Sequence, residues 1–268
     1  MQILRFKSDD NKIYTGCDFD GKKASVIKGD IYTDFSNTKI RKIVKKILPP
    51  ILPKVIYCIG LNYKLHAKET GLDLPRYPIV FMKNIGAAAG HHDDIMIPLS
   101  CAKKPEVDYE AELAVVIQRK AKNVLPENAL DHVLGYTCAN DISARRWQMH
   151  AGGKQWIKGK SFDTFCPFGP WIVTKDEIDD PGNLDLECLL NGNTMQKSNT
   201  GDMIFSVAQI ISYLSQSATL VPGTIILTGT PSGVGFTRQP PVYLKPGDIL
   251  ETRIENIGVL KNQVITEE

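Results

Sequence analysis

Two glutamates, Glu110 and Glu112, stand two positions apart at the start of an apolar segment. On a β-strand this spacing places both side chains on one face, within reach of a single ion. The following residues, Ala114 to Ile117, are apolar on both faces, which is typical of a strand buried on both sides. Two interior carboxylates repel each other and lose hydration, and a divalent cation relieves both costs. The pattern favours a metal site over a solvated strand face.

Asp141 is the best candidate for a third ligand, because it ends an apolar stretch and precedes a possible helical turn. Taken alone, such an aspartate is more often a helix N-cap. Oxygen ligands without a cysteine or histidine nearby suit Mg²⁺, with Mn²⁺ or Ca²⁺ as alternatives, and argue against zinc. We therefore expect Glu110, Glu112 and Asp141 to hold Mg²⁺.

His66 and Glu69 lie three positions apart in a segment with a helical pattern, Asn62 to Thr70. Residues at this spacing share one face of a helix and could form a hydrogen-bonded acid-base dyad. The alternative is an ordinary surface pair.

A glycine-rich turn, residues 228–235, follows a β-branched strand. Its backbone N–H groups and the Thr230 hydroxyl could approach an anion closely. The glycine spacing matches neither a P-loop nor a dinucleotide fingerprint. A purely structural turn is the competing interpretation.

The elements that must position these residues are mostly strands. Residues 1–45 alternate apolar and polar positions in short pieces, which predicts a small β-rich module. The prolines at 49, 50 and 53 make a stiff connector, so we divide the chain into a small N-terminal domain, 1–52, and a catalytic domain, 53–268.

The larger part reads as one mixed, predominantly β domain, so the expected fold class is a β-rich α+β fold. Asn191-Gly192 predicts a two-residue hairpin turn. Helical spacing is clearest over Ser206 to Leu214, and a shorter helix is predicted at Ile142 to Gly152. The predicted strands are Ile79–Met82, Glu110–Ile117, Thr137–Asp141, Trp171–Thr174, Leu184–Leu190, Thr224–Leu227 and Ile249–Ile254.

Composition excludes several other functions. The 268 residues carry 32 Lys plus Arg and 30 Asp plus Glu, a net charge of +2 that favours neither nucleic acid nor a membrane surface. No apolar run is long enough to cross a bilayer, and no leader is recognisable at the N-terminus. The six cysteines are scattered without metal-site spacing, so we expect reduced thiols and a cytoplasmic location, with a mitochondrial one as the alternative.

Several motifs, taken together in order and spacing, resemble the fumarylacetoacetate hydrolase superfamily over residues 53–268. The stretch Trp147 to Pro170 is most similar to the branch that contains the animal mitochondrial fumarylacetoacetate-hydrolase-domain proteins type two, some of which are oxaloacetate tautomerases. The motifs are Gly60-x-Asn62-Tyr63-x-x-His66-x-x-Glu69, Phe81-x-Lys83, Glu110-x-Glu112-Leu113, Asp141-x-Ser143-Ala144-Arg145-x-x-Gln148, Lys160-Ser161-Phe162 and Thr228-Gly229-Thr230-Pro231-x-Gly233-Val234-Gly235.

The resemblance implies a β-roll catalytic domain, a small N-terminal domain and a homodimer with the active site beside the dimer contact. It implies that Glu110, Glu112 and Asp141 are the metal ligands and that a mobile lid carries His66 and Glu69 over the substrate. The remaining implied site residues are Lys160 beside the metal, Arg145 and Gln148 as substrate contacts, and Thr230 with the Gly229 amide as the seat of a substrate carboxylate.

Two features need separate interpretation. Relatives usually continue the Ala-Arg pair with an aspartate, where this chain has Arg146, which affects a local ion pair or the substrate preference. The run His91 to Asp94 has the composition of a metal cluster, but the family has a turn there, so we expect an exposed loop.

A 2-oxo-acid could chelate the ion, which would stabilise the enolate oxygen as it forms. Reprotonation at carbon gives tautomerisation, whereas loss of CO₂ or attack by water gives decarboxylation or C–C hydrolysis. Our first hypothesis is an oxaloacetate tautomerase, which depends on analogy with the branch. The alternatives are a hydrolase or decarboxylase of acylpyruvates, oxaloacetate or a homoprotocatechuate-pathway intermediate, and a non-catalytic metal-binding scaffold.

Overall fold

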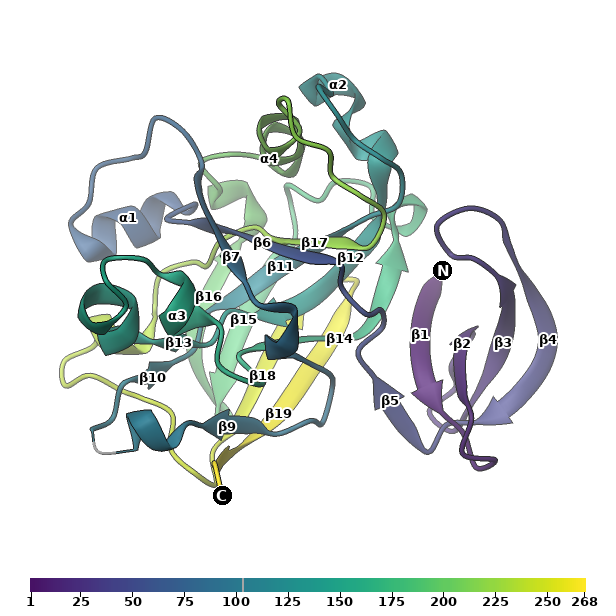
Figure 1. The fold of residues 1–268 in the computed structure, drawn as a ribbon, viewed down its shortest axis with the longest axis horizontal. Helices are drawn as coiled ribbons and strands as arrows, with labels where there is room; N and C mark the ends of the chain where they lie inside the picture. Colours follow the sequence, from purple (N-terminus) through teal and green to yellow (C-terminus); the bar gives the residue numbers. More distant parts are fainter. Residues whose placement is uncertain (103) are drawn as a thin grey trace.

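The computed structural model describes residues 1–102 and 104–268 (Figure 1). Most strands of the described residues belong to one twelve-stranded sheet, and a second sheet has five strands. The prediction of a β-rich mixed fold is confirmed.

The N-terminal strands form one end of the large sheet, in the order β4-β3-β2-β1. Figure 1 shows them gathered on one side of the molecule. Their bounds are β1 Gln2–Lys7, β2 Ile13–Cys17, β3 Lys23–Gly29, β4 Phe35–Ile43 and β5 Lys46–Leu48, which pairs with β1. The predicted β-rich character of this segment is confirmed, while the domain boundary at residue 52 stays a prediction.

The large sheet continues from β1 in the order β14-β12-β11-β17-β6-β7. The bounds are β6 Val55–Gly60, β7 Ile79–Lys83, β11 Ala111–Ile117, β12 Val133–Asn140, β14 Cys166–Thr174 and β17 Thr224–Leu227; the short β8, Ala88–Ala89, pairs with β14. Every residue of β11 and β12 is buried, as the continuous apolar run predicted for β11.

The second sheet has the order β16-β15-β18-β19-β9, and β10 pairs with β13 separately. Side chains join the two sheets: Asn140 Nδ2 donates to Thr252 Oγ1 (3.0 Å), and the Ala111 N–H donates to Gln196 Oε1 (2.9 Å). The bounds are β9 Ile95–Ile97, β10 Val107–Asp108, β13 Ser143–Ala144, β15 Asp185–Leu190, β16 Asn193–Asn199, β18 Ile249–Ile254 and β19 Gly258–Thr266.

Asn191 and Gly192 join β15 to β16 with positive φ angles of 53° and 79°. A two-residue turn of this kind needs φ > 0 at both positions, which Asn and Gly tolerate best. The hairpin prediction is confirmed.

The α-helices are short: α1 Lys64–Thr70, α2 Pro126–Ala129, α3 Ile157–Lys160 and α4 Val207–Leu214. A capping box of Ser206 and Gln209 begins α4, and its apolar face is buried as predicted. The predicted helix at Ile142 to Gly152 is wrong in its first part. Residues 143–144 pair with β10 instead, and a helical segment follows over residues 145–151, of which Trp147–Ala151 is a π-helical turn.

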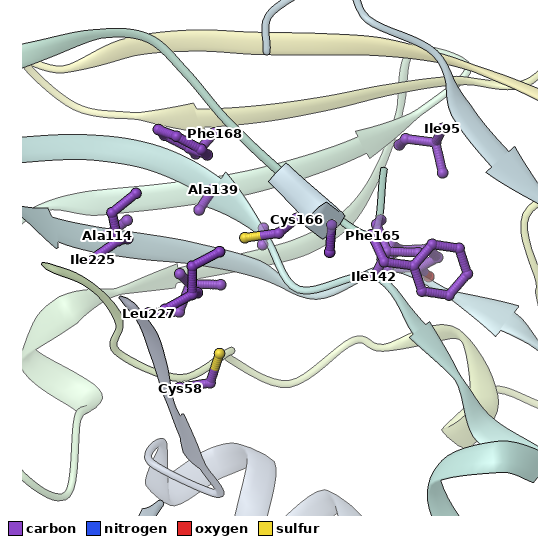
Figure 2. Packing of buried hydrophobic residues seen from close by; sticks show 14 of the residues in the cluster. Cys58, Ile95, Ala114, Ala139, Ile142, Phe165, Cys166, Phe168, Ile225 and Leu227 are labelled. Atoms are coloured by element: carbon purple, nitrogen blue, oxygen red, sulfur yellow. The ribbon is translucent and has the colours of Figure 1, made fainter. Parts of the chain in front are cut away.

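The two faces of β11 contribute to different parts of the core. Ala114 and Val116 belong to one cluster of buried side chains, and Leu113, Val115 and Ile117 belong to another. Figure 2 shows Ala114 in the first cluster near Ile225 and Leu227 of β17. Glu112 is on the same face of β11 as Ala114, because alternate residues of a strand share a face. Its carboxylate therefore points into the interior.

Candidate metal centre

The three predicted metal ligands converge in space. Glu110, Glu112 and Asp141 each offer an oxygen, and these atoms lie within 4.8 Å of one another. All three residues are buried. The pairing of β11 with β12 explains this convergence, because Ala111 lies opposite Asn140 and the Asp141 N–H donates to the Glu110 carbonyl (2.8 Å). The antiparallel pairing of β11 with β12 thus brings the adjoining ends of these two strands together, and the three carboxylates with them.

Buried cations surround two of these carboxylates. Lys160 Nζ lies 2.9 Å from Glu110 Oε2 and 2.7 Å from Asp141 Oδ2. Lys83 Nζ lies 2.5 Å from Asp141 Oδ1, and Arg145 Nη1 lies 2.5 Å from Glu110 Oε1. The charges of Glu110 and Asp141 are therefore compensated by protein groups.

Glu112 differs from both neighbours. Its Oε2 accepts a hydrogen bond from the Gly229 N–H (2.6 Å), and no ion pair joins it to any residue that the structure describes. Burial, with repulsion by Asp141 and Glu110, raises the pKa of Glu112 well above its usual value. At Glu110 burial also opposes ionisation, but attraction by Lys160 and Arg145 outweighs it and lowers the pKa.

The donor set fits a hard divalent cation. With Asp108, which also contacts Arg145, four buried carboxylates meet only three cations, Lys83, Lys160 and Arg145. Among the described residues, Glu112 is the carboxylate of this group that has no cationic partner. Because all available ligand atoms are carboxylate oxygens, the cluster suits an ion such as Mg²⁺ better than one that prefers nitrogen or sulfur.

Lys83 is a site residue whose role the sequence analysis did not assign, although it quoted the motif that contains it. The side chain is buried, and besides Asp141 its Nζ donates to the carbonyl oxygens of Ile142 (3.0 Å) and Lys160. The position of Lys83 on its strand could have indicated this role, because Phe81 and Lys83 are buried while Val80 and Met82 are exposed. A lysine on the buried face of a strand needs an interior acid as its partner.

Arg145 and Gln148, predicted to contact the substrate, lie at the edge of the cluster. Besides Glu110, Arg145 contacts Asp108 through Nε (2.8 Å) and Nη2 (2.7 Å), and Nη1 donates to Gln148 Oε1 (3.0 Å). The structure brings both residues to the metal cluster, and substrate contact stays a prediction.

The glycine-rich turn also reaches the cluster, but its predicted donors have protein acceptors. The Gly229 N–H donates to Glu112, and Thr230 Oγ1 donates to the Ala111 carbonyl (3.0 Å) while accepting from Gln196 Nε2 (2.7 Å). A substrate carboxylate would have to compete for these two groups. Their role as its seat stays a prediction.

His66 and Glu69 form the predicted pair on α1, with 2.8 Å between Nδ1 and Oε2. The other oxygen of Glu69 accepts from the Gly233 N–H (2.8 Å) and from Thr237 Oγ1 (2.9 Å). Burial opposes ionisation of Glu69, but these three partners outweigh it and lower its pKa. The ionised carboxylate accepts at this contact, so His66 Nδ1 is the donor.

Other groups and cavities lie apart from the cluster. Residues 91–94 lie in a loop as predicted, with His92 and Asp94 exposed and His91 and Asp93 half-buried. A cavity of about 580 Å³ is lined by residues such as Trp171, Glu187 and Arg253 and by none of the three carboxylates. We place the functional site by its chemistry, because the cavity has no comparable set of buried ionisable groups.

Three converging carboxylates inside a β-rich fold match the class of metal-dependent enzymes. Residues 55–265 match the family model described as fumarylacetoacetate (FAA) hydrolase C-terminal. The chain belongs to the fumarylacetoacetate hydrolase family, and its substrate is a small molecule.

Curated relatives are similar over most of the chain. It is 48% identical over 225 residues to oxaloacetate tautomerase fahd2, mitochondrial, of Xenopus laevis, covering 84% of this chain and 70% of the relative. Over the same length it is 46% identical to oxaloacetate tautomerase FAHD2A, mitochondrial, of Homo sapiens, covering 84% of this chain and 71% of that one.

Solved structures share the whole fold. A fumarylacetoacetate hydrolase from Exiguobacterium antarcticum is 34% identical with a TM-score of 0.87, covering 100% of both chains. A 2-hydroxyhepta-2,4-diene-1,7-dioate isomerase from Mycobacterium marinum is 35% identical with a TM-score of 0.84, covering 100% of this chain and 99% of that one. Among the described residues no helix is long and apolar enough to span a membrane.

Proposed function

We propose that this protein is a Mg²⁺-dependent oxaloacetate tautomerase. The observation that carries the proposal is the buried cluster in which Glu112 lacks a cationic partner, since this geometry accommodates one hard cation. The names of the relatives at 46–48% identity support the particular substrate.

In this proposal Glu110, Glu112 and Asp141 hold the ion. When bound, it would supply Lewis-acid stabilisation of the negative oxygen of the enolate. Lys160 Nζ, between Glu110 and Asp141, adds fixed positive charge that costs no reorganisation during the reaction. The all-oxygen donor set supports Mg²⁺, with Mn²⁺ or Ca²⁺ as alternatives.

His66 moves the proton. Enol and keto forms of an oxo-acid contain the same atoms. Conversion of the enol to the keto form removes the proton from the enol oxygen and adds a proton to the carbon next to the one that carries this oxygen. Because Glu69 orients His66 through Nδ1, Nε2 is the nitrogen that exchanges protons with the substrate. Glu69 would also stabilise the imidazolium that forms transiently.

The remaining predicted residues bind and orient the substrate. Arg145 and Gln148 lie beside Glu110, where they could contact one end of a dicarboxylate. Gly229 and Thr230 would receive a carboxylate if it displaced their present acceptors, Glu112 and Ala111.

The assembly and the compartment are also proposals. We expect a homodimer with the active site beside the contact, and no binding of nucleic acid or membrane. The cytoplasmic location stays a prediction. The names of the relatives include the word mitochondrial, which favours the mitochondrial alternative.

A coupled assay tests the reaction. We expect loss of the ultraviolet absorbance of enol-oxaloacetate without release of pyruvate, and we expect chelation or Glu110→Ala to abolish it. Glu251→Ala, which removes a carboxylate from β18, is the matched control and should leave the rate unchanged. Stoichiometric pyruvate would favour the hydrolase or decarboxylase, and no metal-dependent turnover on any oxo-acid would favour the non-catalytic scaffold.

A further inference from the structure

Acidic residues alternate along the chain that leads into β11: Glu106, Asp108, Glu110 and Glu112. All four are buried. The last two, Glu110 and Glu112, belong to the metal cluster, whereas the first two do not. Glu106 and Asp108 instead each pair with one of two consecutive arginines.

Asp108 anchors Arg145. It accepts hydrogen bonds from the Arg145 guanidinium and from the backbone N–H groups of Gly235 (2.8 Å) and Phe236 (3.0 Å). It thereby ties Arg145 to the end of the glycine-rich turn.

Glu106 anchors Arg146. Its Oε2 accepts from the Arg146 N–H (3.1 Å), and its Oε1 accepts from Arg146 Nη2 (3.0 Å). The carbonyl oxygen of the same glutamate accepts from the Arg145 N–H (2.9 Å). Arg146 Nη2 also donates to the Ser100 carbonyl (3.0 Å). The pair therefore fixes the backbone on both sides of the Arg145 Cα.

This anchoring adds to a strand pair that is short. β10 and β13 pair over only two residues each, Val107 with Ala144 and Asp108 with Ser143. Yet Arg145, which follows β13 directly, must reach Glu110 with Nη1 at 2.5 Å. A two-residue strand pair supplies few hydrogen bonds of its own. The Glu106–Arg146 pair adds contacts at the end of β13, where a helical turn begins.

We propose that Glu106 and Arg146 are positioning residues that hold Arg145 in place, and through it the orientation of the Glu110 carboxylate for the metal. Among the described residues, no hydrogen bond or ion pair joins either residue to Glu110, Glu112 or Asp141, and Arg146 Nη2 donates to Ser100 and Glu106 instead. The inference rests on the proposed metal site and substrate role of Arg145. It also gives a physical role to the arginine that departs from the family pattern.

The test compares two ion pairs of similar exposure. Arg146 and Arg253 have side chains that are 45% and 47% exposed, and each pairs with a less exposed glutamate, Glu106 or Glu251. The variants are Arg146→Gln, Arg146→Lys, Glu106→Gln and the control Arg253→Gln. Calorimetry with Mg²⁺ measures affinity, steady-state kinetics separate KM from kcat, and thermal unfolding reports stability.

We expect Arg146→Gln and Glu106→Gln to weaken Mg²⁺ binding and raise KM, each by about three- to tenfold, with a much smaller change in kcat. Arg146→Lys should recover much of both losses, and Arg253→Gln should resemble the unmodified protein. The proposal is wrong if Arg146→Gln and Arg253→Gln have the same Mg²⁺ affinity and KM, whatever happens to the melting temperature. A Glu110→Ala variant that still binds Mg²⁺ normally would instead show that the proposed metal site is wrong.

Discussion

The molecule has two groups of potential metal ligands, and they differ in where the fold puts them. Residues 91–94 are contiguous in the sequence, yet they lie in a turn where His92 and Asp94 face solvent. Glu110 and Asp141 lie thirty-one positions apart in the chain, yet the oxygens of Glu110, Glu112 and Asp141 lie within 4.8 Å of one another. Closeness along the chain therefore says little about convergence in space.

The difference has an electrostatic cause. An exposed acid keeps its hydration and needs no ion, whereas a buried one must be paired or must change its pKa. Asp93 uses its carboxylate locally, since Oδ2 accepts from the Gly90 N–H (2.8 Å) and Oδ1 pairs with Lys46 (2.6 Å). Glu112 has no such cation, and that imbalance makes the buried group the better metal site.

The largest expected effect is at Glu112. Glu112→Gln removes a ligand charge without unpairing a buried cation, so Mg²⁺ affinity should fall by more than about a hundredfold. The metal-free protein should nevertheless become more stable, because repulsion by Asp141 and Glu110 is removed. Calorimetry and thermal unfolding in chelator measure the two effects. A lower melting temperature in chelator would contradict the proposed charge imbalance.

The next effect is at Lys83. Lys83→Met leaves Asp141 with one buried cation instead of two, and breaking a buried pair costs about 3 kcal/mol. Chemical denaturation in chelator should show this loss, opposite in sign to the change in Glu112→Gln. Lys46→Met, which breaks the exposed pair with Asp93, is the matched control and should cost less than about 1 kcal/mol. Equal losses of stability in Lys83→Met and Lys46→Met would contradict the proposed role of the buried ion pairs.

A smaller effect concerns the pH dependence of α1. The folded pKa of Glu69 lies below its usual value of 4.5, so ionised Glu69 stabilises the folded state above that pH. This contribution is lost as pH falls through the lowered pKa. The melting temperature of the wild type should exceed that of Glu69→Gln near neutral pH, and the difference should shrink below about pH 4.5. A difference that does not change with pH would refute this account.

The smallest effect is expected in the surface group. His92→Ala with Asp94→Asn should change Mg²⁺ affinity by less than about twofold, because exposed charges at a distance are screened by salt. Calorimetry under the conditions used for Glu112→Gln makes the comparison direct. A large loss of Mg²⁺ affinity in this variant would indicate that residues 91–94, and not the three buried carboxylates, bind the metal.

Much of this site could be predicted from local sequence. The two-residue spacing of Glu110 and Glu112 in a fully apolar strand was enough to predict a shared interior face, and the three-residue spacing of His66 and Glu69 predicted their hydrogen bond. The helix predicted at Ile142 to Gly152 was wrong over its first residues, because pairing of residues 143–144 with β10 overrides local helical preference there, whereas residues 145–151 are helical.

The sequence by itself determined which residue types were available, which strands were buried on both faces and where the hairpin turned. These properties depend on periodicity and on single residues such as Asn191 and Gly192. Only the tertiary structure decided the charge balance of the Glu110, Glu112 and Asp141 cluster. Lys83, Arg145 and Lys160 come from separate segments and leave Glu112 unpaired, and that balance depends on distances set by the pairing of strands far apart in the chain.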